Sequence, residues 1–134
     1  VRNIYMHHCE AQDSVFRLFF AKTNHRRGGF IENIWMKNVR AGRMQRIMEV
    51  DTDVLYQWRD LVPTYKDSVT TIRDLYMDSV CVNRAEVILD LKGDERLPIN
   101  NVSVKNIYVK ELTDSVKYVK NARNIILEGL KYNN

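Results

Sequence analysis

The chain has 134 residues, of which 45% are hydrophobic, and its formal net charge at pH 7 is +4. This length predicts a single domain, and no apolar run approaches the roughly 20 residues of a membrane-spanning helix. The positive charge favours anionic partners, but only His25, Arg26 and Arg27 form a tight basic cluster. We therefore expect neither nucleic acid nor a membrane as a partner.

A nine-residue phrase recurs from the first residue onward. Its clearest copies are residues 1–9, 31–39 and 72–80, and looser copies are residues 99–107 and 122–130. Within each copy, apolar residues alternate with polar or aromatic ones, which is the periodicity of a β-strand. Self-similarity at intervals of roughly 20–50 residues indicates an architecture of stacked repeats.

The phrase also predicts what is stacked on what. An Asn or Asp opens each strand, because these residues tolerate left-handed backbone and suit a sharp corner. The corner ladder is Asn3, Asn33, Asp74, Asn101 and Asn124; the inward apolar stack is Ile4, Ile34, Leu75, Val102 and Ile125; the outward aromatic ladder is Tyr5, Trp35 and Tyr76. We expect side-chain hydrogen bonds between repeats along the corner ladder. We expect the aromatic ladder to stabilise the sheet, and the alternative is that its rings form a sugar-binding platform.

A second apolar strand follows most copies, at residues 15–20, 46–50 and 86–91. Two or three short strands per repeat, joined by corners, are typical of one coil of a parallel β-helix. A helical solenoid fits less well, because β-branched and aromatic residues dominate. We expect an all-β, single-stranded parallel β-helix (solenoid) of about four coils, because five phrase copies bound that many repeats.

Residue 1 already lies inside a phrase, whereas a solenoid normally begins with a polar cap. We therefore expect residues 1–134 to be the C-terminal part of a β-helix domain, truncated at its N-terminal side. This open end is expected to expose the apolar interior around Ile4, Met6 and Cys9. An open strand edge recruits other strands, so we also expect a homodimer through the exposed N-terminal coil edge.

The two cysteines lie far apart in the chain and do not indicate a disulfide framework. Cys9 occupies the phrase position of Val39 and Val80, which predicts a small core residue. Cys81 comes one position later and is expected to face the other way.

The first interruption between repeats, residues 22–29, brings together Lys22, Arg26 and Arg27. Gly28 and Gly29 allow a positive φ, and the three cations suit a carboxylate or a phosphate. The alternative is a solvated turn whose basic residues pair with acids on the next coil.

The second interruption, residues 51–65, is rich in aromatic residues, including Tyr56, Trp58 and Tyr65. Such side chains either stack on sugar rings or pin the loop to the outside of the stack. The third, residues 92–98, contains Gly, Pro and charged residues and predicts a plain turn.

Residues 22–39, with their Lys-Thr-Asn and Arg-Gly-Gly elements, and residues 98–107 resemble the polygalacturonase-like glycoside hydrolases (glycoside hydrolase family 28). These are pectin-cleaving, right-handed parallel β-helices. The resemblance implies an extracellular or periplasmic protein and inverting hydrolysis of galacturonate-containing pectic polysaccharide.

The resemblance also implies roles for particular residues. Lys22 matches the Lys of an Arg-x-Lys element that holds the galacturonate carboxylate. The position of its Arg is Phe20, so Arg17, Arg26 or Arg27 would take that role. Tyr56 matches a substrate-contacting Tyr, and Tyr56 or Trp58 would stack on the acidic polysaccharide.

The Asn-Thr-Asp, Asp-Asp and Gly-His-Gly elements that carry the family's catalysis are absent from this chain. An inverting glycosidase needs two carboxyl groups roughly 6.5–9.5 Å apart. We therefore expect substrate-binding residues but no catalytic residue, and no cofactor or metal, because the three His show no ligand spacing.

One alternative is a non-catalytic β-helix module for carbohydrate binding or structural support. Another is a pectate-lyase-like β-helix, which would require an acidic Ca²⁺ cluster that the sequence does not show.

Overall fold

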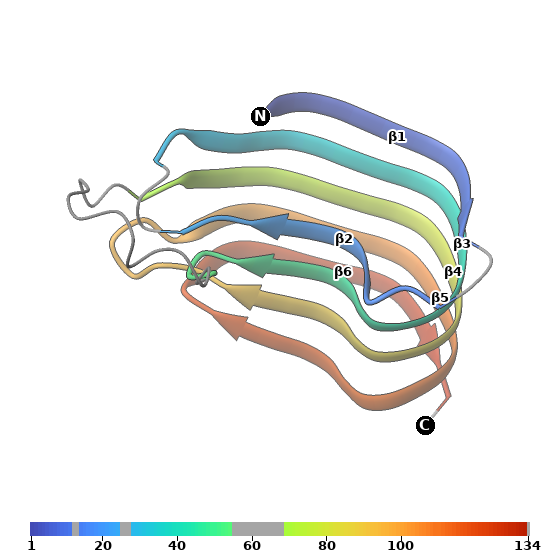
Figure 1. Cartoon of the computed structure of the whole chain (residues 1–134). Coiled ribbons are helices and arrows are strands. Elements are labelled where there is room, and N and C mark those ends of the chain that lie inside the picture. Colours follow the sequence, from blue (N-terminus) through green and yellow to red (C-terminus); the bar gives the residue numbers. More distant parts are fainter. Residues whose placement is uncertain (12–13, 25–27, 55–68, 134) are drawn as a thin grey trace.

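The structure is a computed structural model and describes residues 1–11, 14–24, 28–54 and 69–133. These residues form an all-β fold without helices, so no helix there could cross a membrane. The strands are β1 (Arg2–Ala11), β2 (Arg17–Lys22), β3 (Phe30–Asp51), β4 (Thr71–Lys92), β5 (Ile99–Lys120) and β6 (Ala122–Tyr132). They form a six-stranded parallel sheet in the order β1-β3-β4-β5-β6, and β2 pairs with the second half of β3. Each long strand bends part-way along, and successive strands follow the same curved path (Figure 1).

The predicted Asn and Asp residues form the first corner of each repeat. Their φ angles are 58° at Asn3, 55° at Asn33, 59° at Asp74, 62° at Asn101 and 57° at Asn124. The Asn33 amide donates to Asn3 Oδ1 at 2.8 Å, and the Asn101 amide donates to Asp74 Oδ1 at 2.8 Å. The predicted ladder of side-chain bonds between repeats is therefore confirmed at these two steps, whereas Asn124 donates to Asn100.

A second corner lies five residues further along each repeat, and the sequence analysis did not predict it. The φ angle is again positive at His8, Asn38, Ser79, Asn106 and Gly129. At Gly129, where φ is 63°, an added Cβ would also lie 2.7 Å from Asn106 Oδ1, so glycine is required for both reasons. This corner holds four residue types, whereas the first corner holds only Asn and Asp, which is why the sequence carried a weaker signal here.

The inward apolar stack has the predicted register, with Ile4, Ile34, Leu75, Val102 and Ile125 opposite one another on successive strands. Leu75 and Val102 are 0% exposed, and Ile34 and Ile125 are partly buried. Ile4 keeps the predicted register with Ile34 but is 45% exposed, as expected for an apolar interior that the open N-terminal end leaves uncovered. The reason is that β1 pairs with β3 alone among the described strands, which leaves its other side uncovered.

Cys9 is exposed for the same reason, so its expected exposure at the open end is confirmed, whereas the small buried core residue expected from its phrase position is not. Cys9 lies opposite Val39, as predicted, but its thiol is exposed and free. Val39 and Val80, at the same position on interior strands, are buried. Cys81 is half-buried and also free.

The predicted second strands are present, but with different bounds. The segment predicted at residues 15–20 is β2, which begins two residues later and ends at Lys22. The segments at residues 46–50 and 86–91 are the second halves of β3 and β4 and not separate strands. Their fully buried residues include Met48, Val50, Leu89 and Leu91, which extend the core under β2.

Tyr5, Trp35 and Tyr76 form the predicted aromatic ladder. The Trp35 and Tyr76 ring centroids are 4.2 Å apart with the planes at 30°, and those of Tyr5 and Trp35 are 6.2 Å apart at 36°. Trp35 therefore packs between its two neighbours. This arrangement supports stabilisation of the sheet over a sugar platform, which would need freely accessible ring faces.

Candidate functional site

Lys22 is the last residue of β2 and is exposed at the end of the strand. The next residue fixes the chain there, because the Thr23 amide donates to the Asp51 carbonyl at 2.9 Å. The Thr23 and Thr70 hydroxyls are 2.8 Å apart, and both residues are buried. The backbone that carries Lys22 is thus held on two sides.

The other end of the basic loop is fixed to the same threonine segment. The Thr70 hydroxyl donates to the Gly28 carbonyl at 2.8 Å, and the Thr71 amide donates to the Gly29 carbonyl at 2.9 Å. As predicted, Gly28 and Gly29 have positive φ, at 59° and 68°. A Cβ added at Gly29 would meet nothing within 4 Å, so it is the backbone angle alone that favours glycine there.

Four of the five predicted site residues, Arg26, Arg27, Tyr56 and Trp58, lie outside the described residues, as does Tyr65. Their roles stay predictions. The remaining one, Lys22, lies opposite Asp51, which lies opposite Lys92 and then Lys120 on the following strands. We call these four residues the strand-end row.

The strand-end row contains three lysines and one aspartate. Lys92 Nζ is 4.0 Å from a carboxylate oxygen of Asp51 and equally far from one of Glu49. Asp51 also accepts a hydrogen bond from the Asp53 amide at 2.9 Å. Lys92 is therefore paired with acids on the neighbouring strand, and the row as a whole remains cationic. The predicted alternative for residues 22–29, a turn whose own basic residues pair with acids, stays a prediction.

Arg17, Phe20 and Glu49 lie beside this row. Arg17 Nε donates to Glu49 Oε2 at 2.9 Å, and Glu49 is 3% exposed. The Arg17 guanidinium lies 4.6 Å from the Phe20 ring centroid, and Lys22 Nζ lies 6.0 Å from it. Phe20 itself is 38% exposed. The sequence analysis noted Phe20 only as a missing Arg, whereas the structure makes it an aromatic surface between two cations.

A second buried ion pair repeats the first on the next strand. Arg46, opposite Arg17, has its Nε 3.1 Å from Asp90 Oδ2, and Asp90 is 3% exposed. The hydrogen bond to Asp90 raises the pKa of the Arg46 guanidinium above its ordinary value. Buried carboxylates need such partners, because an unpaired buried charge is costly. The sequence did carry a signal for these ion pairs. Arg17 lies three positions before Phe20, which pairs with Glu49, and Arg46 lies three positions before Glu49, which pairs with Asp90.

A cleft of about 620 Å³ opens at the strand ends, between Asp51 and Lys92 on one side and the turn at residues 93–96 on the other. In this turn Asp94 accepts hydrogen bonds from the Arg96 side chain at 3.0 and 2.9 Å, so the predicted plain turn is confirmed and also lines the cleft. Within the described ranges, no three His, Cys, Asp or Glu residues are grouped to hold a metal ion.

The strand-end row can bind an anionic ligand, and the adjacent Phe20 can contact an apolar ring face. No protein-family model matches the chain, and a search of curated proteins gives no match. The resemblance to polygalacturonase-like hydrolases therefore stays a prediction that depends on the residues quoted for it.

Proposed function

We propose that this chain forms coils of a right-handed, single-stranded parallel β-helix in a polygalacturonase-like glycoside hydrolase. The parent protein would be extracellular or periplasmic and would hydrolyse galacturonate-containing pectic polysaccharide with inversion. Support for the β-helix comes from parallel, in-register phrases with two left-handed corners per repeat and from the shared curved path of the long strands (Figure 1).

The observation that carries the proposed binding role is the position of Lys22, exposed at the end of a cationic row and beside the exposed Phe20 ring. A galacturonate unit has a carboxylate for a lysine and a sugar ring for an aromatic face. Neighbouring strands lie about 4.7–4.9 Å apart. A linear polyanion lying along the row would therefore meet a lysine at three of its four strands and Asp51, which has Lys92 Nζ 4.0 Å from its carboxylate, at the fourth.

A non-catalytic carbohydrate-binding module is the second candidate function. It is favoured by the two buried carboxylates beside the row, because Glu49 and Asp90 are held by Arg17 and Arg46. A carboxylate bound in this way is a structural partner and is not positioned as one half of an acid–base pair. Both candidates share the acidic-polysaccharide site and differ in whether a catalytic pair completes it.

The binding role is tested by titrating the chain with polygalacturonate in a calorimeter, with Lys22→Met as the variant. Losing one charge-assisted contact costs about 1.5–3 kcal/mol, so we expect affinity to fall roughly ten- to hundred-fold. Lys131→Met is the matched control, since this exposed lysine lies on β6, away from the row. Equal affinities of the two variants would refute the assignment of Lys22.

A further inference from the structure

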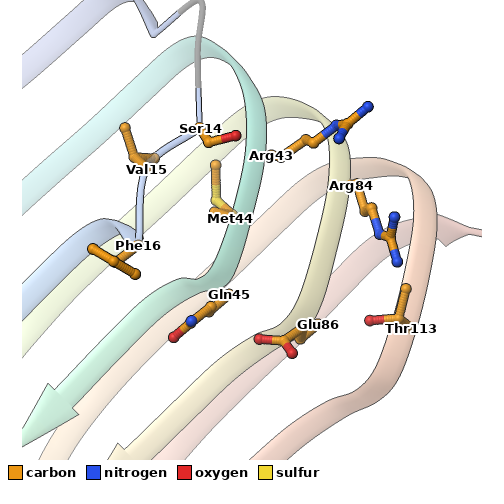
Figure 2. Close-up of a pocket in the computed structure, with 9 residues that line it drawn as sticks. All are labelled: Ser14, Val15, Phe16, Arg43, Met44, Gln45, Arg84, Glu86 and Thr113. Carbon is orange, nitrogen blue, oxygen red and sulfur yellow. The ribbon is translucent and has the colours of Figure 1, made fainter.

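Outside the strand-end row, ligand-type side chains converge at the second corner of the first repeat. By contrast, a groove of about 370 Å³ at the bend of the long strands has Arg43 and Arg84 pointing away from Phe16, so its charged and apolar groups do not meet on one ligand (Figure 2). A hollow of about 720 Å³ lies at the second corner and is lined in part by His8 and Cys9. At its rim two imidazole rings are in contact.

The left-handed corner at His8 brings the side chains of two consecutive residues together. Successive residues of an extended strand point to opposite faces, which is why His7 and His8 showed no ligand spacing in the sequence. At His8, however, φ is 53°, and its Nδ1 lies 2.8 Å from Nδ1 of His7. The same corner on β4 joins Ser79, with a φ of 59°, to Asp78, since the Ser79 hydroxyl donates to Asp78 Oδ1 at 2.9 Å. Contact between neighbouring side chains is therefore a property of this corner.

Further contacts orient the two rings at the surface. The His7 and His8 rings meet edge to face, with their centroids 5.1 Å apart and their planes at 88°, and the Tyr5 centroid lies 5.3 Å from that of His7. The Cys9 thiol donates to the His7 carbonyl at 3.4 Å. Both histidines are exposed, so an ion can reach the rings directly from solvent.

The separation of the two nitrogens matches the spacing of neighbouring ligands on a metal ion. An imidazole nitrogen lies roughly 2.0–2.1 Å from a bound divalent ion, so two such ligands at a right angle are roughly 2.8–3.0 Å apart. At the tetrahedral angle and the same bond length they would be roughly 3.3–3.4 Å apart. The observed 2.8 Å therefore fits the square-planar or octahedral geometry of Cu²⁺ and Ni²⁺ better than a tetrahedral Zn²⁺ site.

We propose that His7 and His8 chelate one divalent transition-metal ion, of the Ni²⁺ or Cu²⁺ class, through their Nδ1 atoms. At present one imidazole donates to the other through these atoms. When the ion binds, the donating ring keeps its single proton on Nε2, so both ligands are neutral and no proton is released.

The rest of the coordination shell is water. Among the described residues, His7 and His8 belong to no group of three His, Cys, Asp or Glu side chains that could hold a metal ion. Lys37 lies opposite His7 and adds an unfavourable positive charge, which Asp78, opposite Lys37, partly offsets. This site does not depend on Lys22 or on the proposed hydrolase.

The test is a calorimetric titration of the untagged chain with Ni²⁺, which binds imidazole without oxidising the free Cys9 thiol. We expect saturable binding of one ion per chain. In an NMR titration of the ¹⁵N-labelled chain, the ring signals of His7 and His8 should broaden before those of His25, the third histidine of the sequence. Mg²⁺, which prefers oxygen ligands, should cause neither effect.

Variants then assign the ligands. His7→Gln removes one imidazole, and His8→Asn removes the other while introducing the residue type that takes this corner at Asn38 and Asn106. Each should weaken Ni²⁺ binding at least about ten-fold, because the second imidazole of a chelate binds as an intramolecular ligand. His25→Gln is the matched control and should leave the affinity unchanged.

Amide spectra with wild-type dispersion establish that each variant is folded. Unchanged affinity in either folded variant of the pair, or no saturable Ni²⁺ binding by the wild-type chain, would overturn the proposal and leave the two rings as a hydrogen-bonded pair. A loss in His25→Gln as large as that in His7→Gln would also overturn it, by placing the ion outside the pair.

Discussion

Two substitutions of Asn101 separate the two ways in which a corner residue stabilises this fold, through its side-chain hydrogen bonds and through its left-handed backbone. Asn101 has a φ of 62°, and its amide donates to Asp74 Oδ1 at 2.8 Å and to Tyr76 Oη at 3.0 Å. Alanine removes both bonds and keeps a Cβ in the left-handed region without the polar side chain that helps asparagine adopt it. Glycine removes the same bonds but accepts the backbone angle.

The magnitudes follow from these contacts. The left-handed conformation costs a residue with a Cβ about 1–2 kcal/mol. The two hydrogen bonds, which are only part-buried, contribute about 1–2 kcal/mol together. Asparagine already bears part of the left-handed cost, so we expect Asn101→Ala to lower the free energy of unfolding by about 1.5–3 kcal/mol. The free energy of unfolding of Asn101→Gly should be about 1 kcal/mol higher than that of Asn101→Ala. Glycine avoids the backbone strain and adds only its own flexibility to the unfolded chain.

Urea unfolding followed by circular dichroism measures both changes. Asn83→Ala is the matched control, because Asn83 is exposed on β4 without a positive φ, and its loss should change stability by less than about 0.5 kcal/mol. Equal stabilities of Asn101→Ala and Asn101→Gly would show that the left-handed backbone is not the reason for asparagine. A loss no larger than that of the control would refute the ladder as a source of stability.

Three further outcomes are expected. The isolated chain should release no reducing sugar from polygalacturonate, because it lacks the family's catalytic elements; release above that of a Lys22→Ala variant would contradict this. Hydrogen bonds from Asn106 and Ser79 hold the pKa of Asp78 below its ordinary value. The stability that these bonds contribute is therefore present above the pKa of Asp78 in the unfolded chain. It is lost as the pH falls through the lower pKa of the folded chain. Asn106→Gly, which keeps the left-handed backbone, should raise the pKa of Asp78 in a ¹³C NMR titration, and an unchanged titration would exclude this cause. Finally, the outer edge of β1 has no paired strand in the described part of the chain, so we expect a two-fold dimer in light scattering that Met6→Lys weakens; a monomer at high concentration would argue against it.

Much of the strand arrangement was predictable, because it depends on local chemistry repeated along the chain. Similar phrases stacked in parallel place equivalent positions opposite one another, which is why Leu75 and Val102 were predicted as partners and Asn33 was predicted to bond to Asn3. Gly28 and Lys22 were predictable for similar reasons, since a positive φ and a strand-end cation are properties of single residues in a short segment.

Other features depend on which segments lie side by side, and no local pattern contains that information. Cys9 matches the buried Val39 in the repeated phrase, but whether such a residue is buried depends on a covering strand, which the outer side of β1 lacks among the described strands. Insertions of unequal length separate the repeats, so the alignment of Lys22, Asp51, Lys92 and Lys120 in one row follows from strand register and not from spacing along the chain. The electrostatics of the strand-end row come from such long-range neighbours, because charge interactions fall off over a few ångströms in space whatever the separation along the chain.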